Sequence, residues 1–273
     1  MNARVGTVDA GRTQVIARAA QLLRAAGTFL PDGASTTELA TATGLARPTA
    51  HRLLGTLAEQ GLMDRDPATG RWNLGPELFL LGAGAAQRYD ITDTARDLID
   101  RLARDTGESA FLSARRGDET VCIYGQEGSF PLRSHVLHEG VRFPLGVASA
   151  GLVILSHLPD RDIDAYFARS NLSMAWGETH SEPELRRRIV STRTTGYAVN
   201  PALLVDGSWG MGAAVFDRNG RPAWALSVTG VETRFRDERQ REMGELLLNS
   251  AHTLSLRLRD SAIPSTGSPR TRA

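Results

Sequence analysis

The stretch RPTAHR at residues 47–52 gathers hydrogen-bonding side chains at the start of an amphipathic segment. The apolar residues there are Ala50, Leu53, Leu54, Leu57 and Ala58, which is the spacing of one helical face. The side chains off this face include Arg47, Thr49, His51 and Arg52. Guanidinium, hydroxyl and imidazole groups contact phosphates and base edges in DNA. The pattern therefore predicts a helix whose first turns bind DNA.

Two helices are predicted before this one. Helical periodicity runs from Thr13 to Gly27, and an S-x-x-E capping box at residues 35–38 starts a second, shorter helix. Gly44 permits the sharp turn into residues 47–59. Two short extended pieces then flank a turn at residues 66–70. This order predicts a winged helix-turn-helix over residues 12–74, whose third helix enters the major groove.

This arrangement gives roles to three further residues. Pro48 lies in the first helical turn, where its missing N–H has no intrahelical partner to lose. Arg65 and Arg71 stand on either side of the hairpin turn and are predicted to reach the DNA backbone or the minor groove. The alternative is a small helical domain whose arginines are only solvated.

Bulk charge does not decide between these interpretations. The formal net charge is +1, and residues 1–75 hold eight arginines against six acidic residues. Every basic residue is an arginine, which in an alanine-rich chain is more simply a sign of a GC-rich genome. A DNA contact must therefore be argued from where the arginines lie.

The sequence pattern changes after residue 74. PELFLLGAGAAQ predicts a linker helix within residues 75–92 that packs against another surface, such as a second subunit. Residues 93–260 alternate helical and strand patterns, which predicts an α+β domain with a largely antiparallel sheet. A hairpin turn is expected at Gly117-Asp118 and a second capping box at residues 181–184. Further strands are expected at 131–136, 196–200, 208–217 and 222–229, and helices at 93–106, 147–158, 160–169, 182–194 and 234–259. Residues 261–273 lack apolar periodicity and are expected to form a disordered tail.

Composition places the chain in a broad class. Its 273 residues are 41% hydrophobic, without an apolar run long enough to span a membrane and without the apolar core of a secretory signal. The single cysteine, Cys122, excludes an internal disulfide framework. We therefore expect a soluble, cytoplasmic protein with no membrane partner.

The sequence gives little support to catalysis, a metal or a cofactor. Cys122 lies between apolar neighbours in a predicted strand and is interpreted as a buried structural thiol. His135-x-x-His138 resembles half a metal site, but positions i and i+3 of an extended segment point to opposite faces. Phosphate-binding glycine loops and nucleophile elbows are absent from the sequence. We expect no catalytic residue, no metal ligand and no cofactor.

From about residue 12 to residue 260 the chain resembles the IclR family of transcriptional regulators, in family order and without large insertions. The resemblance is carried by ELATATGLARPTAHRLLGTLAEQGL, RDPATGRWNLGPELFLLG, ETVCIYGQEG and AVFDRNGRPAWALSVTG. It implies a winged helix-turn-helix, a linker helix and a GAF-like effector-binding domain. It also implies homodimers, often paired into homotetramers, whose action on operator DNA changes with a small molecule.

The resemblance also implies an effector pocket, formed by Ser149, Ala150, Asn200, Gly210, Ser227 and Thr229. Helix N-terminal amides near Ser149 could hold a carboxylate, and residues 227 and 229 share one face of a strand. Family members often carry an acid at the position of Asn200 and a cysteine at that of Gly210. Their replacement predicts a neutral, roomier site for an aromatic or carboxylic acid. Trp176 and Trp209 either line this site or fill core or interface.

Two classes of function follow. The first is a ligand-responsive DNA-binding regulator, expected to be a repressor of catabolic genes under a small organic effector. The second is a small-molecule-binding signalling protein whose N-terminal helices mediate protein contacts. The predicted wing and the polar helix start favour the first class, since the second has no need of either.

Overall fold

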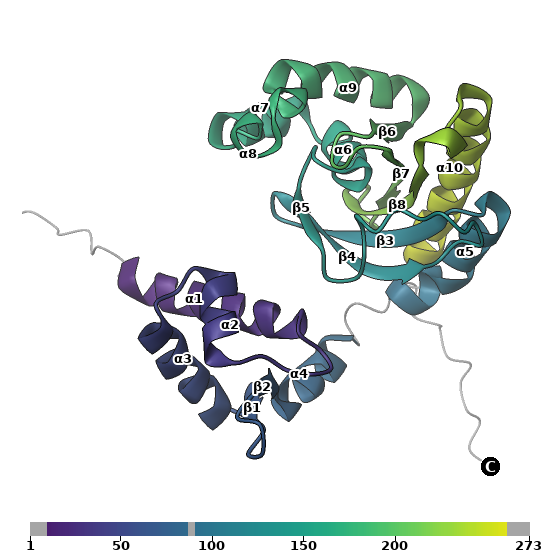
Figure 1. Ribbon diagram of the computed structural model, residues 1–273. Helices are drawn as coiled ribbons and strands as arrows, with labels where there is room; N and C mark the ends of the chain where they lie inside the picture. The colour runs from purple at the N-terminus through teal and green to yellow at the C-terminus, as the bar shows by residue number, and fades with distance from the viewer. Residues whose placement is uncertain (1–9, 87–90, 261–273) are drawn as a thin grey trace, which may run out of the picture. The chain divides into compact units, whose positions relative to one another are not determined.

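The computed structural model describes residues 10–86 and 91–260, which belong to two compact units that divide between residues 89 and 90 (Figure 1). The first unit has one cluster of buried hydrophobic residues and the second unit has two. The described elements of the first unit are α1 (Ala10–Gly27), α2 (Thr36–Thr43), α3 (Arg47–Glu59), β1 (Met63–Arg65), β2 (Trp72–Leu74) and α4 (Pro76–Ala86).

The start of α2 is the predicted capping box. The backbone N–H of Glu38 donates to Ser35 Oγ at 3.2 Å, and the backbone N–H of Ser35 donates to Glu38 Oε2 at 2.7 Å. Gly44 then takes a left-handed conformation with φ of 65°, which turns the chain into α3. The predicted helix-turn-helix is therefore confirmed.

The two-stranded wing is fixed to the helices through Trp72. Its backbone pairs with Ala34 before α2 through two hydrogen bonds of 2.7 and 2.9 Å, and its indole N–H donates to Thr36 Oγ1 at 2.9 Å. The ring is buried in the core that Leu22, Leu39 and Leu54 form between the helices. Burial of these side chains holds β1 and β2 against the helices.

The second unit is built around a six-stranded antiparallel sheet with the order β5-β4-β3-β8-β7-β6. The strands are β3 (Ser109–Arg116), β4 (Glu119–Gln126), β5 (Arg142–Pro144), β6 (Tyr197–Pro201), β7 (Ser208–Phe216) and β8 (Pro222–Val231). The helices are α5 (Ile91–Thr106), α6 (Ser149–Ser156), α7 (Asp160–Arg169), α8 (Ser173–Trp176), α9 (Glu182–Thr195) and α10 (Asp237–Asp260), with short 3-10 turns η1 (Glu178–His180) and η2 (Glu232–Arg234).

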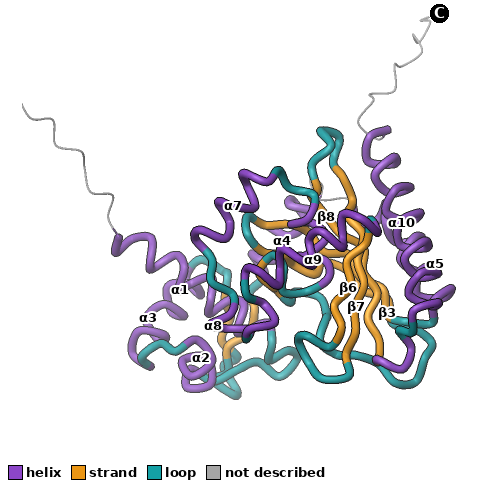
Figure 2. The backbone as a smooth tube through the Cα atoms, turned by 90° about the horizontal axis from the view of Figure 1, so that it is seen from above, coloured by secondary structure: helices purple, strands orange, loops and turns teal. Residues whose placement is uncertain are grey.

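Helices cover both faces of this sheet. Figure 2 shows α5 and α10 side by side on one face and α9 on the other. Leu226 and Val228 of β8 belong to the core beneath α5 and α10. Ala225 belongs to the core that contains α6, so strand alternation turns Ser227 and Thr229 toward α6 as well.

One predicted strand is wrong. Residues 131–136 lie in a loop between β4 and β5, and the edge strand that pairs with the outer side of β4 is β5, Arg142–Pro144. Pro131 has no N–H to give to a ladder. The neighbouring N–H of Phe130 donates to Gly107 O at 3.0 Å, and the Ser134 and Ser208 hydroxyls lie 2.5 Å apart. These contacts hold the segment away from the sheet edge.

The second capping box is also wrong. Ser181 is the N-cap residue of α9, but its side chain makes no capping hydrogen bond. Glu184 instead pairs with Arg187, one turn along the helix. The S-x-x-E spacing lets the serine and glutamate side chains reach each other's backbone N–H groups, but it does not require these hydrogen bonds. An arginine three residues after the glutamate competes for its carboxylate.

The predicted linker of residues 75–92 contains α4, which is described to Ala86, then residues 87–90, which lie outside the described part of the chain, and the first two residues of α5. α5 begins at Ile91, two residues before the expected start of the effector-binding domain. The predicted tail of residues 261–273 also lies outside the described residues.

Candidate DNA interface and effector pocket

One face of α3 is buried and the opposite face is polar. Its buried residues are Ala50, Leu53, Leu54 and Leu57. Arg47, Pro48, His51 and Arg52 are exposed, and Thr49 is half-buried. The predicted contacts therefore gather in the first two turns of a helix whose position is fixed from behind.

The N-terminus of α3 has backbone donors without a side-chain cap. Its N-cap residue is Ala46, which has no side-chain acceptor, and Pro48 lies within the first turn. Uncapped first-turn amides can bond to water or to an anion. Together with the guanidinium groups of Arg47 and Arg52, they make this end of α3 attractive to phosphate.

Arg65 lies on the wing, where the sequence predicted it. Its side chain is exposed, with Nε donating to Gly70 O at 3.2 Å and the guanidinium 5.4 Å from the centre of the Trp72 ring. These contacts hold the group at the hairpin while leaving it in solvent. The geometry is suited to a phosphate contact.

Arg71 is engaged within its own domain. Its Nη2 donates to Gly33 O at 2.8 Å and pairs with Glu38 Oε2 at 3.1 Å, while Nε lies 3.0 Å from Asp32 O. The Ser35 backbone N–H, the Ser35 hydroxyl and then Arg71 hold the pKa of Glu38 below its ordinary value. Arg71 thus ties β2 to the start of α2, a structural role that the sequence did not indicate.

The start of α6 lies directly on β7. A methyl group at Gly212 would come within 3.1 Å of the Ser149 carbonyl carbon, and one at Gly210 within 3.3 Å of Ser149 Oγ. A side chain at either position would crowd the start of α6, so the glycines of the SWGMG sequence in β7 allow the first turn of α6 to lie close to the sheet.

Asn200 and His180 hold the loop that leads into α6. Asn200 Nδ2 donates to Val147 O at 2.7 Å, and its Oδ1 accepts from the Leu203 N–H at 3.1 Å. The ring of the buried His180 lies with Nε2 at 3.3 Å from the same Val147 oxygen and Nδ1 at 3.0 Å from Trp176 O. Burial lowers the pKa of His180.

A cavity of about 30 Å³, here named the first cavity, lies between this loop, the sheet and the loop after β4. Five of the six predicted pocket residues line it, and Ser227 does not. Its walls are Val136, Leu137, Phe143, Ala148, Ser149, Ala150, Asn200, Leu204, Ser208, Trp209, Gly210 and Thr229. Gly210 leaves its part of the wall without a side chain, and the roomier site expected there stays a prediction.

Two hydroxyl groups below this cavity lack partners. Among the described residues, Thr229 Oγ1 and Ser227 Oγ are both buried without a hydrogen bond inside the protein. Thr229 is 8% exposed and lines the cavity, whereas Ser227 is fully buried behind it. A buried hydroxyl without a partner is unfavourable, so Thr229 is a ready hydrogen-bonding group for a bound molecule.

The two tryptophans behave differently. Trp209 contributes to the cavity wall, but its ring packs 6.1 Å from that of Phe235 in the core beneath α5 and α10. Trp176 packs against Phe143 and His180 and does not line the cavity. The core interpretation therefore fits Trp176.

Sequence reasoning missed several wall residues, above all Val136, Leu137 and Ser208. The apolar pair Val136-Leu137 in SHVLHEG could have given a signal, because polar residues flank it on both sides. The strand prediction for residues 131–136 concealed it. His135 and His138 likewise line one common cavity instead of pointing apart, because their segment is a loop.

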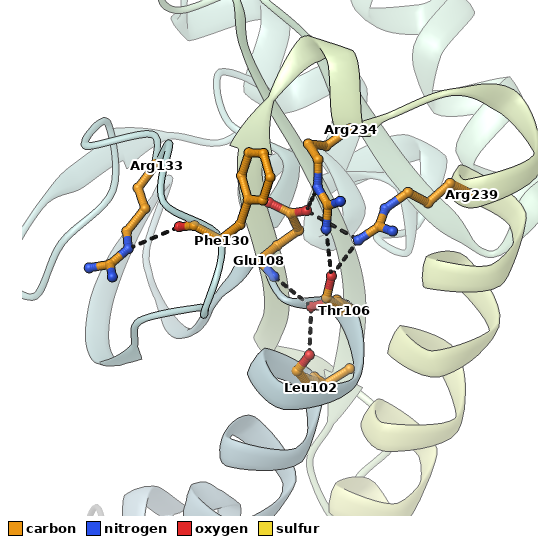
Figure 3. Close-up of polar contacts among 7 residues, drawn as sticks. All are labelled: Leu102, Thr106, Glu108, Phe130, Arg133, Arg234 and Arg239. Carbon is orange, nitrogen blue, oxygen red and sulfur yellow. Dashed lines mark hydrogen bonds and ion pairs between the residues drawn. The ribbon is translucent and has the colours of Figure 1, made fainter.

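A buried ion cluster anchors the start of that loop (Figure 3). The carboxylate of Glu108, whose side chain is 1% exposed, pairs with Arg234 Nε at 2.7 Å and Arg239 Nη2 at 3.2 Å. Both arginines also donate to Thr106 O at the end of α5. The Arg234 guanidinium lies 4.3 Å from the centre of the Phe130 ring. Sequence did not predict this cluster, because its members are more than 120 residues apart.

Burial raises the pKa of Cys122 to about 12, which keeps the thiol protonated and unreactive. The described part of the chain contains no group of three His, Cys, Asp or Glu side chains placed to bind a metal. No helix among the described residues is long and apolar enough to cross a membrane.

Two family descriptions match the chain. Residues 15–67 match the IclR helix-turn-helix domain, and residues 83–256 match the bacterial transcriptional regulator IclR C-terminal domain. The chain is 30% identical over 222 residues to the HTH-type transcriptional regulator KipR of Bacillus subtilis, which covers 81% of this chain and 88% of that protein.

Solved structures share the fold. The IclR protein of Thermotoga maritima is 26% identical, with a TM-score of 0.69 over 90% of this chain and 99% of that one. An IclR homologue from Microbacterium hydrocarbonoxydans, solved with 4-hydroxybenzoate, has a TM-score of 0.70 over 90% of this chain and 99% of that one. At 20% identity, this second likeness extends to the fold alone.

Proposed function

The chain belongs to the IclR family of ligand-responsive transcriptional regulators, whose members are often repressors of catabolic operons, and from this premise we propose how its two units act. The first unit binds operator DNA with the start of α3 in the major groove. The second unit binds a small organic acid at the start of α6. Binding of that acid changes the affinity for DNA, with repression as the expected mode.

The proposed DNA binding is supported mainly by the polar first turns of α3, which lie opposite its buried apolar face. Thr49, His51 and Arg52 are the proposed base-edge contacts, and Arg47 and Arg65 the proposed phosphate contacts. Arg71 supports the wing from within, which changes its proposed role from contact to positioning.

The effector half is supported by the first cavity. Its predicted residues Ser149, Ala150, Asn200, Gly210 and Thr229 come from four different elements and meet at one place. The uncapped amides of α6 and the unpartnered Thr229 hydroxyl are donors for a carboxylate or carbonyl group. Ser227 is proposed to support the cavity from behind.

The competing class, a signalling protein whose N-terminal helices contact other proteins, has less support. The segment that would make those contacts matches a DNA-binding family, and its exposed polar residues gather at one helix end. Enzymatic activity is not proposed, because family members are transcriptional regulators.

A gel-shift titration of the full chain tests this function. Duplex DNA from the region upstream of its own gene is compared with random duplex of equal length at several salt concentrations. We expect binding to the upstream DNA at least about a thousandfold tighter than to the random duplex, weakening steeply with salt. Equal affinity for the two duplexes, or no binding to either, would contradict the proposal.

A further inference from the structure

Ala202, in the loop that joins β6 to β7, has a strained backbone. Its φ is 57°, and among the described residues it is the one non-glycine residue with a positive φ. The left-handed region is unfavourable for alanine, because Cβ crowds the following carbonyl oxygen. Such a conformation persists only where its surroundings hold it, and it is common at ligand clamps and switch segments. The loop of residues 202–207, here named the flap, therefore needs a group that holds it.

The buried side chain of Asn200, near the end of β6, holds the start of the flap. Its Oδ1 accepts from the Leu203 N–H at 3.1 Å, so the side chain spans the strained Ala202. The far end of the flap is fixed by backbone, since the Glu232 N–H donates to Gly207 O at 2.8 Å. One side-chain hydrogen bond therefore supports the strained end of the flap.

The same amide holds the start of α6, which lies against β6 and β7 (Figure 1). Nδ2 of Asn200 donates to Val147 O at 2.7 Å, one residue before Ala148, the N-cap residue of α6. The amide thus uses its donor on the α6 side and its acceptor on the flap side. An amide side chain serves both at once, because its nitrogen donates while its oxygen accepts.

Both segments that Asn200 joins are walls of the first cavity. Ala148 and Ser149 line it at the start of α6, and Leu204 lines it from the flap. Among the described residues, Asn200 is the one side chain that hydrogen-bonds to both residues 145–152 and the flap. His180 also lies against Val147 O but makes no hydrogen bond to the flap. A displacement at the α6 start therefore reaches the flap through the Asn200 amide.

We propose that Asn200 is a positioning residue that couples the start of α6 to the strained flap. A molecule that binds the first amides of α6 displaces the Val147 carbonyl or competes for the Asn200 amide. Either event weakens the hydrogen bond to Leu203, and Ala202 then leaves its left-handed conformation. The flap is therefore the segment that responds when the site is filled. This inference rests on the proposed effector role of the first cavity and adds a route by which filling it moves the protein.

Hydrogen exchange of the full chain without added ligand, followed by mass spectrometry, separates the two bonds of this amide. Asn200→Asp keeps the acceptor for the Leu203 N–H and loses the donor for Val147 O. Exchange should therefore rise at least about fivefold in residues 145–152, as expected for one lost hydrogen bond, and stay unchanged in the flap. Asn219→Asp, in the exposed β7–β8 turn, is the matched control and should change neither segment.

Gly212→Ala tests the coupling itself by moving the start of α6. The added methyl group would come within 3.1 Å of the Ser149 carbonyl carbon, so this backbone must shift. Exchange in the flap should then rise at least about threefold. In the Asn200→Asp background the same substitution should leave the flap unchanged, because the route is cut. Should Gly212→Ala fail to fold, Gly210→Ala replaces it, since a methyl group there meets the Ser149 side chain first, at 3.3 Å.

Ala202→Gly tests the strain in the flap. Glycine takes a positive φ readily, so exchange in the flap should slow at least about twofold. Ala168→Gly is the control, because Ala168 is exposed within α7. Glycine inside a helix should instead speed exchange locally.

Three outcomes would overturn the inference. They are a flap that responds equally to Gly212→Ala in both backgrounds, a flap that responds in neither, and faster flap exchange in Ala202→Gly. Because these measurements contain neither DNA nor effector, they are independent of the gel shift. The expected exchange pattern without specific DNA binding would reject the regulator function alone. Specific DNA binding without this pattern would reject the coupling through Asn200 alone.

Discussion

At the scale of single residues, the protein keeps polar groups where folding alone gives no reason for them. Thr229 and Ser227 are buried without partners on the same face of β8. A buried unpartnered hydroxyl costs about 1–3 kcal/mol of stability. Such a cost at a cavity wall is typical of a binding site, where stability is given up for function.

Thr229→Val tests this trade-off, since valine keeps the shape and removes the hydroxyl. We expect the free energy of unfolding to rise by about 1 kcal/mol, measured in urea, and binding of a probe carboxylate such as benzoate to weaken. Ser227→Ala is the control, because Ser227 is equally unpartnered but does not line the cavity. Ser227→Ala should raise the free energy of unfolding without weakening the binding of the acid. A loss of binding in both variants would contradict the distinction between the two hydroxyl groups.

His180 should make stability depend on pH. Its pKa in the folded protein lies below the ordinary 6.5 because of burial. The unfolded chain therefore takes up a proton near pH 6.5 that the folded chain takes up only at lower pH, so stability falls as pH falls through this window. His180→Gln should flatten the fall in unfolding free energy between pH 8 and pH 5.5. His252→Gln, on the exposed side of α10, should not change it.

At the scale of elements, local sequence predicted what local physics determines. The Ser35–Glu38 capping box, the periodic helices and the glycine-centred β3–β4 hairpin turn follow from neighbours a few residues apart. The loop at residues 127–141 did not follow, because its path depends on Gly107 and Ser208, which are distant in sequence. The prediction of the cavity wall was incomplete for the same reason. Leu137 reaches it only because that loop folds over the sheet.

The Glu108 cluster should be a strong tie between elements. Glu108→Gln leaves two arginines without their carboxylate, and breaking a buried pair costs about 3–5 kcal/mol. The arginine side chains are 27% and 31% exposed, so we expect a smaller loss of about 2–3 kcal/mol in urea unfolding. Glu184→Gln removes an exposed pair within α9 and should cost less than about 1 kcal/mol. Equal losses would contradict the role of burial.

At the scale of the whole molecule, α4 has an apolar surface that its own unit leaves uncovered. Phe79, Leu80 and Leu81 are 78%, 61% and 56% exposed. Contiguous exposed apolar side chains indicate an interface, and a second copy of the chain is the proposed partner. Light scattering at micromolar concentration should give a dimer or tetramer, and Phe79→Glu with Leu80→Glu should weaken it. A monomeric wild-type chain would contradict this prediction.

The central claim is that the start of α3 reads DNA bases while the wing contacts the backbone. The most direct test measures binding of wild type, Arg52→Ala and Arg65→Ala to upstream and random duplexes across a salt series. Arg24→Ala, an exposed arginine on α1, serves as the control. We predict that Arg52→Ala weakens binding to the upstream duplex by about 1–3 kcal/mol and changes random binding little. Arg65→Ala should weaken binding to the upstream and the random duplex by similar factors, and it should reduce the slope of log affinity against log salt concentration by about 1. Equal losses on both duplexes for Arg52→Ala would contradict the account.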